Sequence, residues 1–554
     1  MSDESAVQHD EKEHFFGAAR VVAGLTVVSR MLGLVRDMAI FALGATTATD
    51  VFWTAFSVPN LFRRLFGEGA LSAAFVPVFT EVSRTDGWER ARVVLANVMG
   101  WLAVILAGLL IVGELGLGLW RMIAPGPWDQ QLLLQLLQIV LPFMVTVCLL
   151  ALASAALNCK GHFAYPAFAP VILNVALIAA AAVVHLGGLG SDWQGLFVLS
   201  ASVIVAGVVQ LAGVYWLLRA AKLASLPSLR PLLPQTRRIA RLMLPMMIPL
   251  GLLQFSAFFD RLYALIMTAT AESPTLSLLG WSIDRPLAPG VVTCLYAANR
   301  LYQFPLGVLA ISVATAVFPL FSRYAASKDT PSLRDATNRA LRLSLFLGIP
   351  AGVAISILAL PIITLICRHG NFTADNVPRA AAILKMYCLG MWAYFCNHIL
   401  LRAFFAMKDA RTPLRISCVL AALNVLLVVV LIFTRLRSAG IGLATAITAT
   451  LNSLALIVLL RRRLGGLGIG RLLGSLGRTL AATAAMAAAA TYGLHLAAGR
   501  LGQSGSIETW PWPKVATCLA VAIAAGLTAF FLAAKVMGCQ ELAELTRRGR
   551  KRAQ

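Results

Sequence analysis

The amino-acid sequence predicts an all-α polytopic membrane protein with fourteen transmembrane helices. These form two six-helix lobes, related by a pseudo-two-fold axis along the membrane normal, plus two extra C-terminal helices. The composition is the first reason, because 59% of the 554 residues are hydrophobic and only 13% are charged. Soluble chains have about 45–50% apolar and about 25% charged residues. Long apolar runs and an internal repeat are the second and third reasons.

The apolar runs are long enough to cross a bilayer. A hydrocarbon core of about 30 Å needs about 20 helical residues. Soluble helices seldom extend that far without a polar face, which argues against a large soluble protein. The second, seventh and eighth runs exceed the required length, so these helices are expected to tilt, bend or protrude. The predicted spans are 17–44, 49–82, 93–122, 131–158, 165–186, 194–219, 239–270, 290–323, 337–366, 379–407, 413–434, 440–460, 472–497 and 513–537.

The loop charges predict that both termini face the cytosol. With a cytosolic N-terminus, the inside loops between spans hold 23 Lys and Arg residues and the opposite loops hold 8. Basic residues accumulate in cytoplasmic loops. This topology signal also explains the net charge of +23 without nucleic-acid binding. The acidic start, "MSDESAVQHDEKEHFF", lacks the basic region of a signal peptide and is expected to be a cytosolic tail.

Two pairs of similar segments indicate an internal repeat. "FVPVFTEVSR" (75–84) resembles "VFPLFSRYAA" (317–326), and "LNV" at 173–175 recurs at 423–425. The offset corresponds to six spans, so both copies enter the membrane in the same direction. A substrate site is expected at the interface of such lobes, near mid-membrane. The predicted parts are a tail (1–16), an N-lobe (17–222), a C-lobe (237–463), the last two spans (472–537) and a basic cytosolic tail (538–554).

Several predicted spans carry charged residues. Even the mildest scale gives a cost of about 2.5–3.5 kcal/mol for each such residue at the bilayer centre. These side chains therefore need water, a partner charge or a ligand. They are Arg30, Arg36 and Asp37 in the first span, Asp50, Arg63, Arg64 and Glu68 in the second, Asp260 and Arg261 in the seventh, and Arg300 in the eighth.

Two explanations are open for these charges. Glu68 lies four residues after Arg64, a spacing that permits an ion pair. Asp260 and Arg261 can likewise neutralise each other or snorkel. The remaining arginines outnumber nearby acids, and a guanidinium presents a rigid fork of donors to phosphate oxygens. A lipid-linked pyrophosphate therefore fits a cavity lined by Arg30, Arg36, Arg63 and Arg300.

Several motifs resemble the MurJ/MviN family of lipid II flippases, within the multidrug/oligosaccharidyl-lipid/polysaccharide exporter superfamily. The likeness extends over all fourteen spans and is most specific in the first two. The segments that carry it are "SRMLGLVRD" (29–37), "ATDVFWTAFSVPNLFRRLFGEGALSAAFVPVF" (48–79), "NCKGHFAYPAFAPVILN" (158–174) and "YAANRLYQFPLGVLAISVATAVFP" (296–319). The resemblance implies translocation of undecaprenyl-pyrophosphate-linked disaccharide-pentapeptide from the inner to the outer leaflet of the bacterial cytoplasmic membrane.

The resemblance also implies roles for individual residues. It implies essential arginines at Arg30, Arg36, Arg63 and Arg300. Charge partners or gating residues are expected at Ser29, Asp37, Asp50, Arg64, Glu68, Asp260, Arg261 and Asn299. Asn299 replaces an acidic residue that is common in the family, and Asp260 is the candidate compensating charge. The family pattern further implies a lipid-tail groove in the last two spans, although the small residues of 481–493 suit helix packing equally well.

One segment is longer than the family pattern. Residues 272–290, "ESPTLSLLGWSIDRPLAPG", separate the seventh and eighth spans. The insert is expected either to cap the periplasmic face or to be disordered.

We expect transport by alternating access without a cofactor or metal. Membrane potential, with or without Na⁺ or H⁺ coupling, is sufficient in scale, since 100 mV acts on one moved charge with about 2.3 kcal/mol. The expected partners are lipid II, membrane lipids and candidate cell-wall synthesis or division proteins, but no nucleic acid. The nine scattered cysteines form no CxxC pair and indicate neither a disulfide framework nor a metal site.

Three other functions compete with this interpretation. A flippase for another polyprenyl-linked glycan has the same chemistry. A multidrug exporter of the same superfamily is less consistent with the arginine excess, because cation binding favours acidic, aromatic cavities. A membrane enzyme is disfavoured because the sequence has no HExxH, DxD or glycine-rich phosphate loop.

Overall fold

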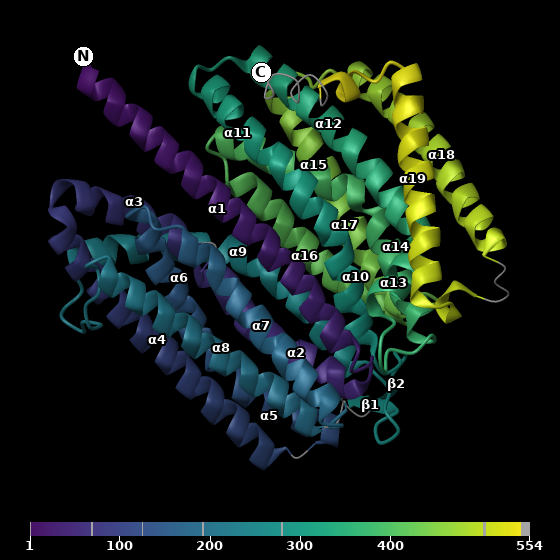
Figure 1. Ribbon diagram of the computed structural model, residues 1–554, viewed down its shortest axis with the longest axis horizontal. Coiled ribbons are helices and arrows are strands. Elements are labelled where there is room, and N and C mark those ends of the chain that lie inside the picture. The colour runs from purple at the N-terminus through teal and green to yellow at the C-terminus, as the bar shows by residue number, and fades with distance from the viewer. Residues whose placement is uncertain are drawn as a thin grey trace. The chain divides into compact units, whose positions relative to one another are not determined.

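The computed structural model describes residues 2–67, 70–124, 126–190, 193–278, 281–501 and 506–544. The chain is 83% helical, and its one sheet in the described residues is a two-stranded hairpin (Figure 1). The all-α fold class predicted from the sequence is confirmed.

The contacts within the chain define two compact units. The first comprises Met1–Leu265 and Thr270–Ser273, and the second comprises Ile266–Ala269 and Pro274–Gln554. The domain limits predicted from the sequence, an N-lobe of 17–222 and a C-lobe of 237–463, stay a prediction. The first turn of α9 joins the first unit through Thr236, whose hydroxyl donates to Asn97 Oδ1 over 2.8 Å.

The first unit contains nine α-helices and one π-helical segment among its described residues. The second predicted span falls on α2, the π segment η1 and α3. The elements are α1 (Ser2–Phe41), α2 (Thr47–Phe62), η1 (Arg63–Gly67), α3 (Ala70–Thr85), α4 (Gly87–Ile123), α5 (Trp128–Val140), α6 (Phe143–Cys159), α7 (Ala164–Leu186), α8 (Trp193–Ala220) and α9 (Pro234–Ile266).

The second unit begins with a hairpin, which a series of helices follows. Its described elements are β1 (Thr275–Leu278), β2 (Trp281–Asp284), α10 (Val291–Pro305), η2 (Leu306–Ala310), α11 (Ile311–Ala326), α12 (Thr330–Ile357), α13 (Ala359–Cys367), α14 (Asn376–Leu389), α15 (Met391–Ala406), α16 (Arg411–Ile432), α17 (Ser438–Arg463), α18 (Ile469–Arg500), the 3₁₀ turn η3 (Ile507–Thr509) and α19 (Trp512–Val536).

Eleven helical stretches are long and apolar enough to cross a membrane, among the residues that the structure describes. The other three predicted spans fall on α1, on α9 and on the pair α14–α15, which is broken near Gly390. A multi-pass helical membrane protein is thus confirmed, while the count of fourteen spans stays a prediction.

The two units share an irregularity that the sequence repeat did not reveal. A π-helical segment interrupts the second and the eighth predicted spans, one in each unit, with η1 after Pro59 and η2 directly after Pro305. Proline lacks the N–H that an α-helix needs and its ring crowds the preceding turn, so the hydrogen-bond ladder shifts locally. Single π turns inside helices are frequent at functional sites. Here η1 begins at Arg63, and η2 follows Arg300 in the chain.

Helices α18 and α19 pack closely because small residues face each other. A Cβ added at Gly493 would lie 3.2 Å from the Ala525 Cβ, and one at Gly526 would lie 3.1 Å from the Ala490 Cβ. The buried positions of 481–493 therefore serve helix packing, one of the two alternatives drawn from the sequence. The lipid-tail groove stays a prediction.

Two helix ends in the second unit place lysine where glycine is usual. Lys328 and Lys408 follow α11 and α15 with φ of 55° and 58°. In each case the next N–H donates to the carbonyl five residues back, Asp329 to Tyr324 (2.9 Å) and Asp409 to Phe404 (3.0 Å), which is the 6→1 bond of the Schellman pattern. A Cβ in this left-handed region is strained.

Replacing Lys328 by glycine is therefore expected to stabilise the protein by about 0.5–1 kcal/mol. Glycine removes the strain of the left-handed backbone conformation, and part of that gain is offset because glycine loses more conformational entropy on folding. Thermal unfolding in detergent measures the change. Arg90→Gly, at an exposed position inside α4, is the matched control and should destabilise by about 1 kcal/mol. Equal effects of the two glycines would contradict the argument.

Candidate functional site

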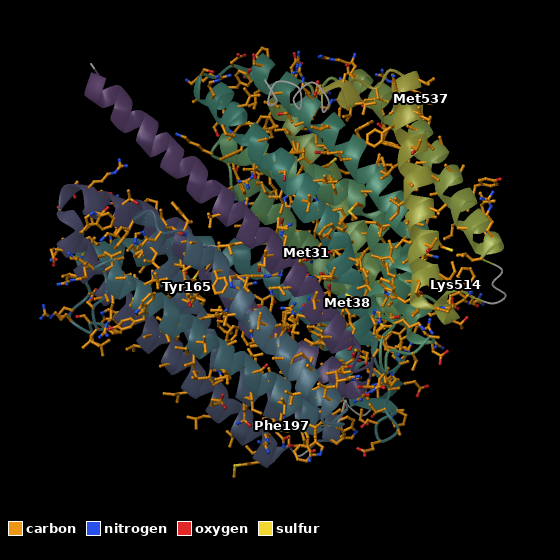
Figure 2. All side chains as sticks on the ribbon, in the orientation of Figure 1. Met31, Met38, Tyr165, Phe197, Lys514 and Met537 are labelled. Carbon is orange, nitrogen blue, oxygen red and sulfur yellow. The ribbon has the colours of Figure 1, made fainter. Side chains whose placement is uncertain are left out.

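A buried polar cluster joins α1 to α7 in the first unit. Arg36 Nε and Nη2 donate to Asp37 Oδ1 over 3.0 and 2.5 Å, and Arg36 Nη1 donates to Asn174 Oδ1 over 3.1 Å. The Asn174 amide in turn donates to the Ser29 carbonyl over 3.0 Å. Arg36 and Asp37 lie on the stretch of α1 between Met31 and Met38, the two residues of this helix that Figure 2 labels.

Burial makes this cluster strongly coupled. Arg36 is 8% exposed and Asp37 is fully buried. A buried ion pair keeps its charges only when hydrogen bonds satisfy both partners, and removal of one partner costs about 3–5 kcal/mol. Asn174 supplies one of these bonds. The sequence reasoning missed Asn174 as a site residue, although a polar residue in an apolar span, repeated in both "LNV" copies, was the available signal.

Arg30 differs from Arg36 in its surroundings. Its side chain is exposed, and no hydrogen bond or ion pair of this side chain occurs among the described residues. Asn174 holds the carbonyl of the preceding residue, Ser29. The two arginines of "SRMLGLVRD" thus have different environments, since Arg36 is held in a buried cluster and Arg30 is exposed.

The second span contributes a further group of charges. Asp50 is fully buried in the first turn of α2, after a capping box formed by Thr46 and Thr49. At the start of η1, the half-buried Arg63 donates from Nε to Asn60 Oδ1 over 3.4 Å. Arg64 is exposed. Glu68, the predicted partner of Arg64, lies outside the described residues.

The charges of the seventh span lie on α9, within the first unit. Asp260 and Arg261 are both half-buried, and each has interactions with other groups. Their predicted mutual neutralisation, and the compensation of Asn299 by Asp260, stay predictions.

Arg300 lies on α10 in the second unit and is exposed. The adjacent Asn299 accepts a hydrogen bond from the Gln303 amide, one turn later. Tyr302 stacks on Tyr387 of α14 and Tyr394 of α15, with ring centroids 4.7 and 5.3 Å apart. This aromatic stack fixes α10 beside the position of Arg300.

Metal-binding chemistry has no support in the described part of the chain, where no group of three or more His, Cys, Asp or Glu residues has a suitable arrangement. The nine cysteines are free thiols, and most are buried. They fill apolar space, as the sequence pattern indicated.

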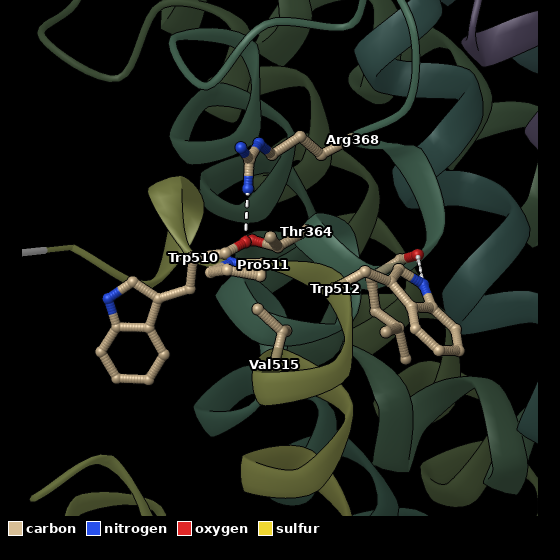
Figure 3. Close-up of a pocket in the computed structure, with 7 residues that line it drawn as sticks. Thr364, Arg368, Trp510, Pro511, Trp512 and Val515 are labelled. Atoms are coloured by element: carbon tan, nitrogen blue, oxygen red, sulfur yellow. Dashed lines mark hydrogen bonds between the residues drawn. The ribbon is translucent and has the colours of Figure 1, made fainter. Parts of the chain in front are cut away.

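Helices α18 and α19 are fastened to the rest of the second unit at one end by tryptophans. Figure 3 shows a cavity of about 130 Å³ between α13 and the start of α19. Arg368 Nη1 donates to the Trp510 carbonyl over 2.7 Å, and Trp512 Nε1 donates to the Leu365 carbonyl over 3.3 Å. The Leu365 carbonyl belongs to the last turn of α13, where a helix leaves its carbonyl groups without intrahelical partners.

At the other end, Glu541 fastens the segment after α19. It is 2% exposed and accepts from Ser475 of α18 over 2.8 Å and from Arg342 Nε of α12 over 2.6 Å. Gln540 accepts from Arg342 Nη2 over 2.9 Å. Burial alone would raise the pKa of Glu541, but its backbone, Ser475 and Arg342 bonds lower it overall. We call Arg342, Ser475, Gln540 and Glu541 the Glu541 cluster.

Comparisons with known proteins agree with these features. Residues 40–507 match the family described as lipid II flippase MurJ. A probable lipid II flippase MurJ of Rhizobium meliloti is 33% identical over 534 residues, covering 95% of this chain and 94% of the relative. The lipid II flippase MurJ of Burkholderia cenocepacia is 32% identical over 417 residues, covering 73% and 76%.

Solved structures show the same fold. A lipid II flippase MurJ in an inward closed conformation superposes with a TM-score of 0.70 at 21% identity, covering 93% of this chain and 98% of that one. An inward-facing multidrug transporter of the MATE family superposes with a TM-score of 0.60 at 15% identity, covering 81% and 98%. On the extent of the family match and of the full-length relatives, this chain belongs to the lipid II flippase MurJ family.

Proposed function

We propose that this chain moves lipid II from the inner to the outer leaflet of the bacterial cytoplasmic membrane. The observation that carries the proposal is the pair of environments in "SRMLGLVRD". Arg36 is held by Asp37 and Asn174, whereas the side chain of Arg30 is exposed. An exposed guanidinium in a predicted span is available to a phosphate group, for which its fork of donors is well suited.

The proposed mechanism is alternating access. Arg30 binds the pyrophosphate, and Arg63 and Arg300 add positive charge around it. The lipid tail stays in apolar surroundings, for which the α18–α19 pair is the candidate. Closure on one side and opening on the other then exposes the headgroup to the outer leaflet.

A complete cycle needs an energy source, because binding alone cannot drive net transport. Membrane potential supplies about 2.3 kcal/mol per charge at 100 mV. Coupling to Na⁺ or H⁺ is part of the proposal as an addition to the potential. The chain acts as a transporter and not as an enzyme, so no cofactor takes part.

The proposed topology places both termini in the cytosol. The excess of Lys and Arg in the inside loops supports it. Lipid II and membrane lipids are the proposed partners, and a cell-wall synthesis or division protein on the outer side is consistent with delivery of the product.

Reconstitution into liposomes tests the function. Protein in vesicles with labelled lipid II should transfer the label between leaflets, and an imposed potential should bias the direction. The control replaces lipid II by an undecaprenyl-pyrophosphate that carries an unrelated glycan. Equal transfer of both lipids would favour the rival glycan flippase, and transfer of neither would contradict both functions.

A further inference from the structure

The segment 272–290 forms an ordered hairpin within its described residues. Strands β1 and β2 pair in antiparallel register, with Leu276 opposite Ile283 and Leu278 opposite Trp281 at the Cα positions. The sequence left two alternatives for this insert, a cap on the periplasmic face or a disordered segment. The paired strands exclude disorder over the described residues.

The hairpin is amphipathic. Residues directly opposite each other share a face, and alternate residues along a strand do as well. Leu276, Trp281 and Ile283 therefore fall on one face. The other face carries only polar residues, Thr275 opposite Asp284 and Ser277 opposite Ser282.

The apolar face is open. Trp281 is 78% exposed, which is the largest exposed fraction of any tryptophan among the described residues. Leu276 and Ile283 are only half-buried. A two-stranded hairpin with an uncovered apolar face is marginally stable in water, so this face needs a covering surface.

The base of the hairpin is fixed. Arg285 binds back to the preceding segment, from its N–H to the Pro274 carbonyl (3.0 Å) and from Nη1 to the Thr268 carbonyl (3.3 Å). Leu287 is 2% exposed and exchanges backbone bonds with Met267 and Ala269. The hairpin therefore projects from a rigid base rather than from a loose loop.

The chain positions limit where this face can lie. Strand β1 begins nine residues after α9 ends, and β2 ends seven residues before α10 begins. Both helices correspond to predicted membrane spans, so the hairpin lies close to the membrane surface. Tryptophan is enriched at that depth, since its ring is apolar and its N–H needs a polar partner.

We propose that the hairpin docks its apolar face into the lipid headgroup region of the outer leaflet, with Trp281 as the inserted residue. The occupant of this face is thus a lipid surface. Its attachment is apolar rather than electrostatic, because the polar face bears Asp284 and the nearby Arg285 is engaged with Thr268. The proposal does not depend on the substrate that the protein transports.

Site-specific labelling tests the proposal. An environment-sensitive fluorophore is attached to Trp281→Cys and, as the matched control on the polar face, to Ser282→Cys. The parent protein, treated with the same fluorophore, corrects for labelling of the native cysteines, most of which are buried. In phosphatidylcholine vesicles, lipids brominated near the headgroup should quench the label at 281 several-fold more than the label at 282, and aqueous iodide should show the reverse order.

The docking should also be independent of lipid charge, so phosphatidylglycerol vesicles should give the same pattern. Iodide quenching of both labels without a response to brominated lipid would overturn the proposal. If the label at 281 is protected from iodide but is not quenched by brominated lipid, a protein or a substrate headgroup covers this face instead. That result would also overturn the proposal. If the cysteine variants do not fold, intrinsic tryptophan fluorescence is compared between the parent and Trp281→Phe. The proposal predicts that the fraction of this fluorescence quenched by brominated lipid is smaller in Trp281→Phe, and an unchanged fraction would overturn it.

Discussion

Replacing Arg30 or Arg300 by alanine is expected to abolish complementation of flippase-depleted cells while the protein still accumulates in the membrane. Both side chains are exposed in the structure, so truncation removes a charge without opening a buried cavity. A lost charge-assisted bond to phosphate is worth about 1.5–3 kcal/mol. Growth after depletion, with protein abundance measured in the same cells, checks the prediction.

Arg36 provides the contrast. Arg36→Ala also removes function, but it leaves the fully buried Asp37 without the guanidinium that contacts it, so abundance should fall as well. Arg84→Ala, at an exposed position near the end of α3, is the surface control and should grow normally. Normal growth of both Arg30→Ala and Arg300→Ala would contradict the proposed roles of these arginines.

Replacing Glu541 by alanine is expected to cost about 3–5 kcal/mol of stability, because it leaves the largely buried Arg342 without its carboxylate partner. The side chains of Arg342 and Glu541 are 12% and 3% exposed. Thermal unfolding in detergent measures the loss. The exposed pair of Arg92 and Glu89, 3.1 Å apart with 40% and 84% of the side chains exposed, is the control. Glu89→Ala should cost at most about 0.5 kcal/mol, and similar losses in both variants would refute the argument.

The Glu541 cluster should also be sensitive to acid. The folded-state pKa of Glu541 lies below its ordinary value of 4.5. A carboxylate with a lowered pKa stabilises the fold fully above the ordinary pKa, and this contribution disappears as the pH falls through the folded pKa. The stability difference between the parent and Glu541→Gln should therefore be constant near neutral pH and shrink below about pH 4. A difference that stays unchanged there would contradict this assignment.

The sequence predicted the helical fold and the repeat because apolar length and loop charge are local properties. It did not predict the two π segments, since Pro59 and Pro305 alone do not say whether a helix breaks, kinks or slips by one residue. It also missed the hairpin register, although the alternation in "TLSL" and "WSID" was visible, because such short runs are ambiguous.

The charged residues show a similar limit. Arg30 and Asp37 are seven residues apart, a spacing that puts them on one face of a helix, yet the Asp37 carboxylate is held by its neighbour Arg36. A guanidinium reaches sideways along a helix, so residue spacing alone does not fix its partner. Asn174 comes from a helix 138 residues further along the chain, and only the packing of α7 on α1 brings it to Arg36.

Equilibrium binding to the purified protein tests the central claim most directly. Lipid II and undecaprenol, which lacks the diphosphate, are titrated against the parent and Arg30→Ala. The account predicts that the parent binds lipid II much more tightly than undecaprenol. It also predicts that Arg30→Ala weakens lipid II binding by about tenfold or more, which is 1.4 kcal/mol per factor of ten, without changing undecaprenol binding. Unchanged affinity for lipid II in Arg30→Ala would contradict the claim that this guanidinium holds the diphosphate.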